Sequence, residues 1–531
     1  MNRVKKFLLS KYYFLTSILL FLSFPSYDFF ALKFFSFFAW FFLVPLYVYL
    51  RGKSLKEVIY ISFLTGIIGN LFTYGWIGNF GAKVPGGSIV ILLFLIPSLT
   101  AFFTIKILLA EFLSQKYPKL DFLIYPSIWI IVDYIQSIGF LAFPWTYIGY
   151  SQYPFISFIQ MSSVTGILGV NFLIIMFNIA IGNFIKRLDW EGGFFIKYLY
   201  STREGKIFLY ISATLIFIII AGFVRVKSFE EGEGKFKISV IQTCISPWDN
   251  WHLRRYEYLG ELIKYTKMAV ADDPDLIIWS ESATLETISF RWQNSEKDLF
   301  DQHLFNFVRE INKPVLTGEI GVIAKRDGYR IRLYPQNSAL LIKENGVPEK
   351  TYAKINLVPF GEWFPYQKWF SFVKKLVDKM GGSDFVPGSV PELFTLKERK
   401  FAVLICYEGI FYRLCRDYKN KGADFLINIT NDGWTDTFNG HYQHFAASVF
   451  RAVENGIPVV RAGNTGVSAV ITPIGTVAST MPYLTKGYFS GFVDVLAKKD
   501  TFYQYLGDWV LYISCIFCGF LLVFGKVKKL F

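Results

Sequence analysis

Long apolar stretches separated by short polar segments fill the chain up to residue 225. A helix needs about 20 mostly apolar residues to cross the hydrocarbon core of a membrane. Stretches of this kind lie at 12–26, 30–50, 57–76, 88–110, 121–139, 163–185 and 207–225, and one more lies at 506–525. The pattern therefore predicts a polytopic α-helical membrane domain with about eight spans.

The segment between the seventh and eighth spans has a different pattern. Short apolar runs typical of buried strands, such as KISVIQ, FAVLICYE and ADFLINITND, alternate with amphipathic helical patterns at 250–270, 297–311 and 441–455. This alternation indicates sheets that are covered by helices. The predicted domains are a transmembrane domain at 1–225, an α/β domain at 226–505, and a last span with its tail at 506–531.

The composition supports a membrane protein, because 53% of the 531 residues are hydrophobic and 57 of them are Phe. The formal net charge of +14 could also indicate a nucleic-acid-binding protein. Many of the Lys and Arg residues outside residues 226–505, however, flank the apolar stretches. We therefore expect a membrane, and no nucleic acid, as a partner.

The positive charges are distributed unevenly among the loops. Lys and Arg precede the first span and follow the second, fourth and sixth, whereas Lys83 is the only cation between the third and fourth spans and residues 140–162 contain none. Cytoplasmic loops retain Lys and Arg in membrane proteins. Both termini are therefore predicted to be cytoplasmic, and residues 226–505 are predicted to lie outside the cytoplasm.

Three reactive residue types lie at or near the ends of predicted strands. Glu281 closes DLIIWSE, Cys406 lies at the end of FAVLICYE, and Lys354 belongs to YAKINLVPFGEW. A carboxylate can take the thiol proton, the thiolate can attack an acyl carbon, and an ammonium can stabilise the oxyanion. The spacing alone favours ordinary ion-pair and packing roles over this chemistry.

The sequence motifs around these residues favour the catalytic interpretation. IIWSE, YAKINLVPFGE, LICYE and NITNDGW, in this order, resemble the nitrilase, or carbon-nitrogen hydrolase, superfamily. The resemblance implies an αββα sandwich in which Glu281 is the general base and acid, Lys354 stabilises the oxyanion and Cys406 is the nucleophile. One departure is WSES, since the family often has Pro after the Trp.

One branch of that superfamily places its domain between seven membrane spans and one, and the chain resembles this apolipoprotein N-acyltransferase branch. FPWTYIGYSQ, QTCISPWDNW and VPFGEW carry the resemblance as well. It implies that Cys406 takes an acyl chain from a phospholipid, typically phosphatidylethanolamine, as a thioester. The acyl chain then passes to the α-amine of a diacylglyceryl-cysteine on an apolipoprotein, at the bacterial inner membrane.

The same resemblance implies further site residues. Glu362, Tyr407 and Glu408 would support the catalytic groups, and Trp251 and Trp434 would lie at the substrate region. Ion-pair roles for the carboxylates and packing roles for the tryptophans remain alternatives. A carboxylate beside a catalytic thiol is unfavourable without a charge partner, which favours a functional role for Glu408.

Residues 363–390 contain an amphipathic pattern in which Trp369 and several aliphatic residues share one helical face that the lysines avoid. This pattern is typical of a helix at a membrane interface. It suggests a lid that touches the bilayer and admits a lipid, with Trp369 in contact with the substrate. A helix that only covers its own domain fits equally well.

Other chemistries have weaker support. His441 and His444 are spaced like metal ligands, but no third ligand motif accompanies them, and a surface or core role is favoured. No phosphate-binding or dinucleotide-binding motif is present, so neither a metal nor a cofactor is expected. Asp133 lies within a predicted span without an evident partner.

Two rival functions remain open at this stage. A membrane-tethered amidase would release its acyl group to water through the same three residues. A non-catalytic membrane scaffold would only bind, although the presence of Glu281, Lys354 and Cys406 together argues against it. We expect a monomer.

Overall fold

A computed structural model of the chain separates into two compact units. The helical unit comprises Met1–Ala82, Gly86–Ser228 and Tyr505–Phe531, and the α/β unit comprises Lys83–Pro85 and Phe229–Gln504. The structure describes residues 11–25, 35–81, 87–139, 142–187, 195–230, 235–327, 330–359, 361–363, 384–494 and 500–524. Most of the segment predicted to form a lid, including Trp369, lies outside these described residues.

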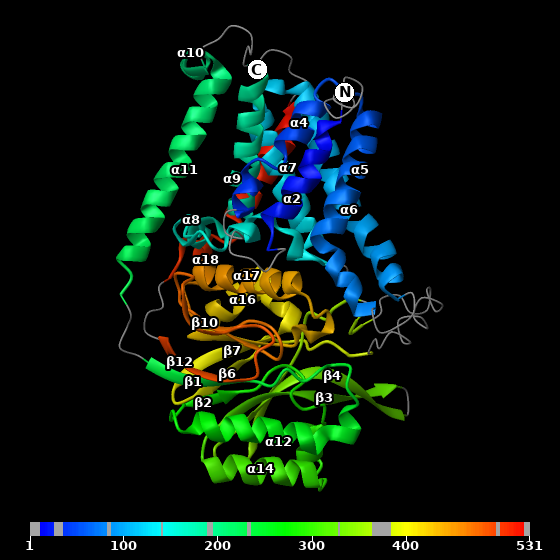
Figure 1. Ribbon diagram of the computed structural model, residues 1–531, viewed down its shortest axis with the longest axis vertical. Coiled ribbons are helices and arrows are strands. Elements are labelled where there is room, and N and C mark those ends of the chain that lie inside the picture. The colour runs from blue at the N-terminus through cyan, green and yellow to red at the C-terminus, as the bar shows by residue number, and fades with distance from the viewer. Residues whose placement is uncertain are drawn as a thin grey trace. The chain divides into compact units, whose positions relative to one another are not determined.

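Every predicted span corresponds to a helix of the helical unit (Figure 1). These helices are α2 (Leu15–Ser23), α4 (Val44–Leu50), α5 (Leu55–Tyr74), α6 (Gly87–Lys116), α7 (Asp121–Gln136), α9 (Ser162–Arg187), α11 (Arg203–Lys227) and α19 (Trp509–Phe524). Within the described residues, four helices are long and apolar enough to cross a membrane, and they contain α5, α6, α9 and α11. The others are shorter, and the 16 residues of α7 would rise only about 24 Å.

A buried ion pair lies inside the helical unit and supplies the partner that the sequence did not reveal for Asp133. Lys106 Nζ lies 2.5 Å from Asp133 Oδ1, and Asn171 Nδ2 donates to Asp133 Oδ2 at 2.7 Å. Asn171 Oδ1 also accepts a hydrogen bond from the Gly149 backbone N–H at 2.8 Å. The pair therefore joins α6, α7 and α9 to the FPWTYIGYSQ loop.

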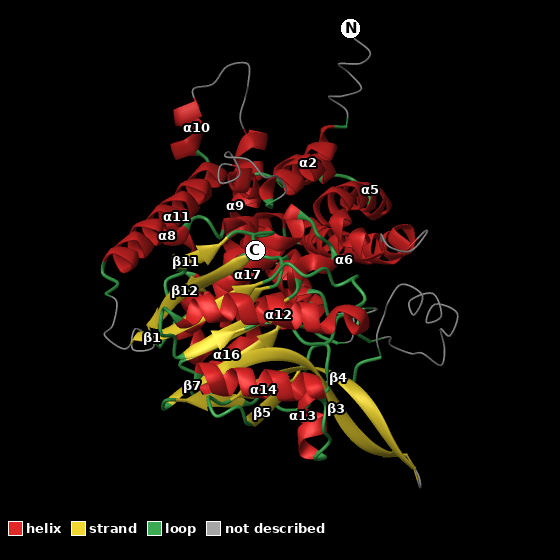
Figure 2. Cartoon of the chain, turned by 60° about the horizontal axis from the view of Figure 1, so that its bottom comes forward, coloured by secondary structure: helices red, strands yellow, loops and turns green. Residues whose placement is uncertain are grey.

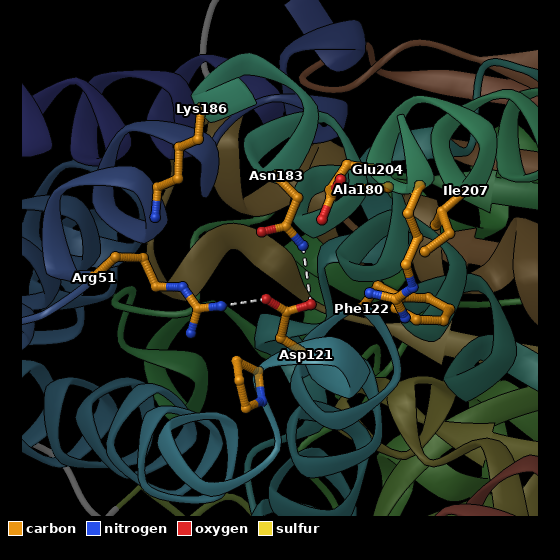
Figure 3. A pocket seen from close by; sticks show the side chains of 10 residues that line it. Arg51, Asp121, Phe122, Ala180, Asn183, Lys186, Glu204 and Ile207 are labelled. Carbon is orange, nitrogen blue, oxygen red and sulfur yellow. Dashed lines mark hydrogen bonds and ion pairs between the residues drawn. The ribbon is translucent and has the colours of Figure 1, made fainter. Parts of the chain in front are cut away.

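The helical unit also contains a cavity of about 350 Å³ (Figure 3). Asp121 lies at its wall, where it accepts a hydrogen bond from Asn183 Nδ2 at 2.9 Å and forms an ion pair with Arg51. Lys186 and Arg203 line the cavity as well. The charge of Arg51 is thus balanced inside the protein by a buried carboxylate.

The α/β unit contains two six-stranded sheets. The first sheet has the order β12-β1-β2-β3-β4-β5 and the second has the order β11-β10-β9-β8-β7-β6. The strands of the first sheet are β1 (Lys235–Gln242), β2 (Leu276–Ile278), β3 (Val315–Asp327), β4 (Arg330–Ile342), β5 (Pro348–Ala353) and β12 (Gly487–Asp494). Those of the second are β6 (Leu393–Leu396), β7 (Arg399–Ile405), β8 (Phe425–Thr430), β9 (Val459–Gly463), β10 (Ser468–Ile471) and β11 (Val477–Met481).

Helices cover the outer faces of both sheets, as the order of layers in Figure 1 shows. Helices α12 (Trp251–Val270) and α14 (Leu299–Ile311) lie on the first sheet, and α16 (Tyr412–Asn420) and α17 (Phe438–Asn455) lie on the second. Between the sheets, the ring of Phe236 packs against that of Phe425 with centroids 5.4 Å apart. The predicted fold class, a helical membrane domain with an αββα sandwich, is confirmed.

The strands form where the sequence places continuous apolar runs, because residues between a helix layer and a second sheet are buried on both faces. All six residues of β8 are buried, and so are the last five of β7. The antiparallel β3–β4 pair instead extends away from the rest of its sheet (Figure 2). In the half of this pair that lies away from the sheet, apolar residues are mixed with polar ones. Glu281, Cys406 and Asn431 follow the carboxyl ends of the buried parallel strands β2, β7 and β8.

Candidate active site

Cys406 directly follows β7 and begins a short 3-10 helix, Cys406–Ile410. Its backbone φ is +51°, in the left-handed region that non-glycine residues rarely adopt. Such strain is typically maintained at functional sites by the surrounding structure. Here the Cys406 carbonyl oxygen accepts hydrogen bonds from Asn428 Nδ2 at 3.2 Å and from His444 Nε2 at 3.1 Å. The turn presents the half-buried thiol at the end of the strand.

Glu281 lies just beyond β2, in a turn whose next residue, Ser282, also has a positive φ of 54°. The carboxylate is 3% exposed. Its Oε1 accepts from Asn337 Nδ2 at 2.8 Å, and its Oε2 accepts from the Asn431 backbone N–H at 2.8 Å. Donors from both sheets therefore hold this carboxylate in place.

Lys354 follows β5 and is buried. Its Nζ lies 2.9 Å from Glu362 Oε1 and 3.5 Å from Glu281 Oε1. Its backbone N–H donates to the Asn337 carbonyl at 2.8 Å, and Asn337 Nδ2 reaches Glu362 Oε1 at 2.6 Å. One ammonium is thus shared by two carboxylates, and Asn337 contacts all three residues.

Glu408 connects the turn that carries Cys406 to the segment that carries Lys354. Its Oε2 accepts from the Ile405 backbone N–H at 2.8 Å. Its Oε1 accepts from Tyr352 Oη at 2.8 Å and from the backbone N–H groups of Ile355 and Asn356 at 2.7 and 3.1 Å. Four donors from two sheets converge on one buried carboxylate, so Glu408 fixes the spacing between the nucleophile turn and the lysine segment.

Two family models match this chain. The model for the apolipoprotein N-acyltransferase N-terminal domain matches residues 16–180, and the model for carbon-nitrogen hydrolases matches residues 237–496. Apolipoprotein N-acyltransferase 1 of Treponema denticola is 29% identical over 518 residues, which are 93% of this chain and 92% of the relative. Apolipoprotein N-acyltransferase of Geobacter metallireducens is 30% identical, over 93% of this chain and 91% of the relative.

The chain belongs to the apolipoprotein N-acyltransferase family. Among solved structures, an amidase from Nesterenkonia sp. matches with a TM-score of 0.37 and 19% identity, over 52% of this chain and 94% of the amidase. The fold assignment above rests on the sheets and helices themselves and not on that match. In this family member, the three residues named from the sequence lie at the ends of strands of both sheets.

The electrostatics of the acyltransferase site oppose ionisation of the resting thiol. Burial and the nearby Glu281 carboxylate raise the pKa of Cys406 above its ordinary value, although Lys354 acts in the other direction. Burial also raises the pKa of Glu281, which Lys354 partly offsets. Burial alone would lower the pKa of Lys354, but Glu362 and Glu281 raise it, so the ammonium stays charged. The raised pKa of Cys406 favours a protonated sulfur in the resting site.

The remaining predicted residues have different surroundings. Tyr407 is buried beside Cys406, and its ring meets that of Phe411 edge-on with centroids 5.2 Å apart. Trp434 is half-buried and packs against Trp248 at 5.2 Å, three residues after the backbone N–H that binds Glu281. Trp251 is buried in the hydrophobic core beside the first sheet, and its Nε1 donates to Glu286 at 3.1 Å. These contacts suit the packing alternative, and the substrate-binding role of Trp251 stays a prediction.

Several residues that shape the site were not identified from the sequence. Asn337, which bridges Glu281 and Glu362, lies outside the sequence motifs that carry the family resemblance. Asp432 lies inside NITNDGW but carries no assigned role there, and its partner Arg461 is 29 residues away. For His444 a surface or core role was favoured over metal binding; the structure buries it and places its Nε2 against the Cys406 carbonyl, a contact that the sequence did not indicate. Within the described part of the chain, no group of three or more His, Cys, Asp and Glu side chains is arranged to hold a metal ion.

Proposed function

We propose that this chain transfers an acyl chain from a phospholipid to the N-terminal α-amine of a diacylglyceryl-cysteine on apolipoproteins. The supporting observation is the convergence of Glu281, Lys354 and the Cys406 turn at strand ends, in a chain whose relatives are apolipoprotein N-acyltransferases. Phosphatidylethanolamine is the expected donor. The protein acts as a monomer, without a metal or a cofactor.

In the first step, Glu281 accepts the Cys406 thiol proton while sulfur attacks the ester carbonyl carbon of the phospholipid. The Lys354 ammonium stabilises the negative charge that develops on the carbonyl oxygen. The carbon–oxygen ester bond then breaks, and Glu281 returns the proton to the departing alkoxide. The products are an acyl thioester on Cys406 and a lysophospholipid.

In the second step, the α-amine of the acceptor attacks the thioester carbonyl carbon. Glu281 takes a proton from the amine, Lys354 again stabilises the oxyanion, and the carbon–sulfur bond breaks. The sulfur recovers its proton from Glu281, so the enzyme returns to its starting state. Glu362, which contacts Lys354 at 2.9 Å, holds the ammonium between the two carboxylates.

Membrane attachment suits these substrates. In this proposal, residues 226–505 form an extracytoplasmic catalytic domain tethered by a span at each end in the bacterial inner membrane, and both termini are cytoplasmic. Each CH₂ group of an acyl chain withdrawn into water would cost about 0.8 kcal/mol. A domain held at the membrane surface can receive two lipidated substrates without that expense.

The test is intact mass of the purified protein, first with phosphatidylethanolamine and then with a diacylated lipopeptide. The wild type should gain one acyl chain and lose it to the peptide amine, whereas Cys406→Ala should gain none. Cys415→Ala is the matched control, because Cys415 is a buried thiol on α16 that the mechanism does not use. Loss of the acyl chain to water without peptide would indicate a hydrolase instead, and a wild type that never loads would indicate a binding scaffold.

A further inference from the structure

The carbonyl group of Cys406 is held by side chains from two separate elements. Asn428 donates to it from β8 and His444 donates to it from α17. A carbonyl oxygen only accepts hydrogen bonds, so the hydrogen at this contact is carried by His444 Nε2. Because Cys406 has a φ of +51°, the orientation of its peptide group depends on such contacts.

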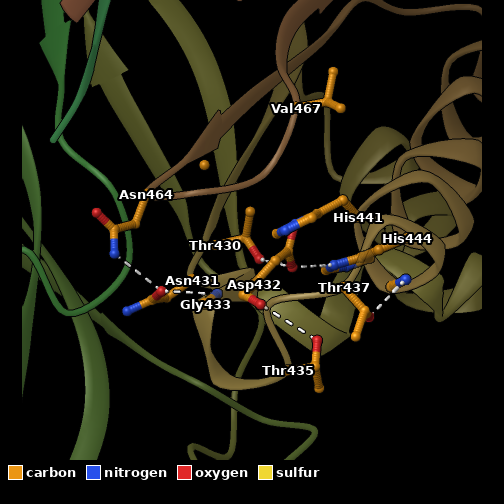
Figure 4. Close-up of polar contacts among 12 residues, drawn as sticks. Thr430, Asn431, Asp432, Gly433, Thr435, Thr437, His441, His444, Asn464 and Val467 are labelled. Carbon is orange, nitrogen blue, oxygen red and sulfur yellow. Dashed lines mark hydrogen bonds and ion pairs between the residues drawn. The ribbon is translucent and has the colours of Figure 1, made fainter. Parts of the chain in front are cut away.

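The ring of His444 is itself held from the other side. Its Nδ1 lies 2.8 Å from Asp432 Oδ1 (Figure 4). Asp432 Oδ2 lies 2.5 Å from Arg461 Nη2. All three residues are buried or nearly so. The strong pairing with Arg461 and His444 keeps the pKa of Asp432 well below its usual range, in spite of burial. Arg461 Nη2 also lies 3.1 Å from His444 Nδ1, so the guanidinium and the carboxylate together set the position of the imidazole.

The end of β8 links this network to the rest of the site through three consecutive residues. Thr430 donates to Asp432 Oδ1 at 3.0 Å and also forms a hydrogen bond with the Cys406 side chain. The Asn431 backbone N–H donates to Glu281 Oε2 at 2.8 Å. Movement of Asp432 would thus displace contacts to both the nucleophile and the general base.

We propose that His444 is a positioning residue for the nucleophile, which holds the Cys406 carbonyl through Nε2–H while Asp432 and Arg461 hold the imidazole. The inference rests on the proposed role of Cys406. It assigns a part in acyl transfer to a chain of contacts that runs from Arg461 through Asp432 and His444 to the backbone of Cys406.

Two substitutions separate the two ends of the imidazole. The amide nitrogen of Gln lies near the position of His Nε2, so His444→Gln keeps a donor for the Cys406 carbonyl. The amide nitrogen of Asn lies near the position of Nδ1, so His444→Asn keeps the contact with Asp432 but does not reach Cys406. We expect acyl loading to fall at least about tenfold in His444→Asn and to stay within about threefold of the wild type in His444→Gln.

His441→Gln is the matched control. His441 lies one turn earlier on α17 and is just as buried, but its Nδ1 is 3.7 Å from Asp432 and neither ring nitrogen has a hydrogen-bond partner in the structure. Acyl loading should change less than threefold in this variant. If His444→Asn does not fold, Asn428→Leu removes the other donor to the same carbonyl and should slow loading by a similar factor.

An alkylation assay tests the position of the Cys406 thiol independently of acyl transfer. The rate at which iodoacetamide modifies Cys406, followed by peptide mass, needs no acyl donor. His444→Asn should slow alkylation several-fold at a fixed pH, and His444→Gln should not. A wild type that is alkylated but never loads acyl would overturn the proposed function alone. Equal rates for the two His444 variants in both assays, at equal melting temperature, would overturn the positioning role.

Discussion

Both units of this chain bury an ammonium beside a carboxylate, but with opposite outcomes. In the helical unit, Lys106 and Asp133 form a pair at 2.5 Å, and Asn171 satisfies the second carboxylate oxygen. In the α/β unit, the Lys354 ammonium is shared by Glu362 and Glu281, with the longer distance of 3.5 Å to Glu281. In the first arrangement both carboxylate oxygens of Asp133 have a donor among the described residues.

The second arrangement leaves negative charge in excess next to a thiol. In the proposed mechanism a proton moves between Cys406 and Glu281, and burial raises the pKa of both groups. The same pair of residue types would then stabilise the fold in one unit and take part in proton transfer in the other. The difference lies in the number of partners for each charge.

The largest expected effect comes from breaking the Lys106–Asp133 pair. Asp133→Ala leaves the Lys106 ammonium buried without its partner, which should lower the free energy of unfolding by about 3–5 kcal/mol. Thermal unfolding in detergent measures the loss. The double variant Lys106→Met/Asp133→Leu should recover most of it, since an apolar pair of similar volume replaces the ions. A single variant as stable as the wild type would show that the pair does not support the helical unit.

Removing the shared ammonium should have the next largest effect, and we expect it on activity. Lys354→Met removes the group that stabilises both oxyanions in the proposed mechanism, so acyl loading should fall about 100- to 1,000-fold. Intact mass against time measures the loading rate. Lys343→Met is the control, because Lys343 pairs only with Glu349 at the surface, at 2.9 Å. Comparable losses in both variants would contradict a specific role for Lys354.

Glu408→Gln tests the connection between the two segments of the site. Gln places an N–H₂ group among four donors, so at least one buried donor loses its acceptor. We expect a loss of about 1–3 kcal/mol in the free energy of unfolding, with a smaller decrease in acyl loading. Chemical denaturation and intact mass on the same preparation give the two values. An unchanged stability would mean that Glu408 does not join the segments.

The smallest expected effect is a shift in the pKa of Cys406, and the sign of this shift tests how the neighbouring charges act on the thiol. The Glu281 carboxylate raises the pKa of Cys406, so Glu281→Gln should lower the pKa of the thiol and speed its alkylation several-fold at pH 8, while acyl loading falls. Lys354→Met should act in the opposite sense, because Lys354 lowers the pKa of the thiol. Alkylation of Cys406 across pH 6–10 measures both shifts. Shifts of the same sign would refute this account of the charges.

Much of the architecture was predictable from local patterns. Long apolar stretches located the main helices of the helical unit, and continuous apolar runs located β1, β7 and β8, because membrane and sandwich environments each demand a recognisable sequence of side chains. The lengths of the helices were less predictable. Helix α7 has 16 residues and ends at Gln136, whereas the apolar stretch continues to residue 139. The catalytic candidates were found because a family resemblance singled out words that spacing alone would not.

The partners of those residues were not predictable. Asn431 and Glu281 are 150 positions apart, and His444 and Cys406 are 38 apart. Periodicity reports which face of an element is buried, but it does not report which distant element packs against that face. The same limit applies to Trp251, whose packing in the core beside the first sheet the sequence did not indicate.

The sequence by itself determined which segments suit a membrane, which segments form strands, and which residues can carry acyl transfer. These properties follow from side-chain chemistry and from spacing within one element. The tertiary structure decided how many donors surround each charge, from the ion pair at Asp133 to the shared ammonium of Lys354 and the doubly held carbonyl of Cys406. Hydrogen bonds reach only about 3 Å, so these decisions depend on contacts that form when distant strands and helices meet.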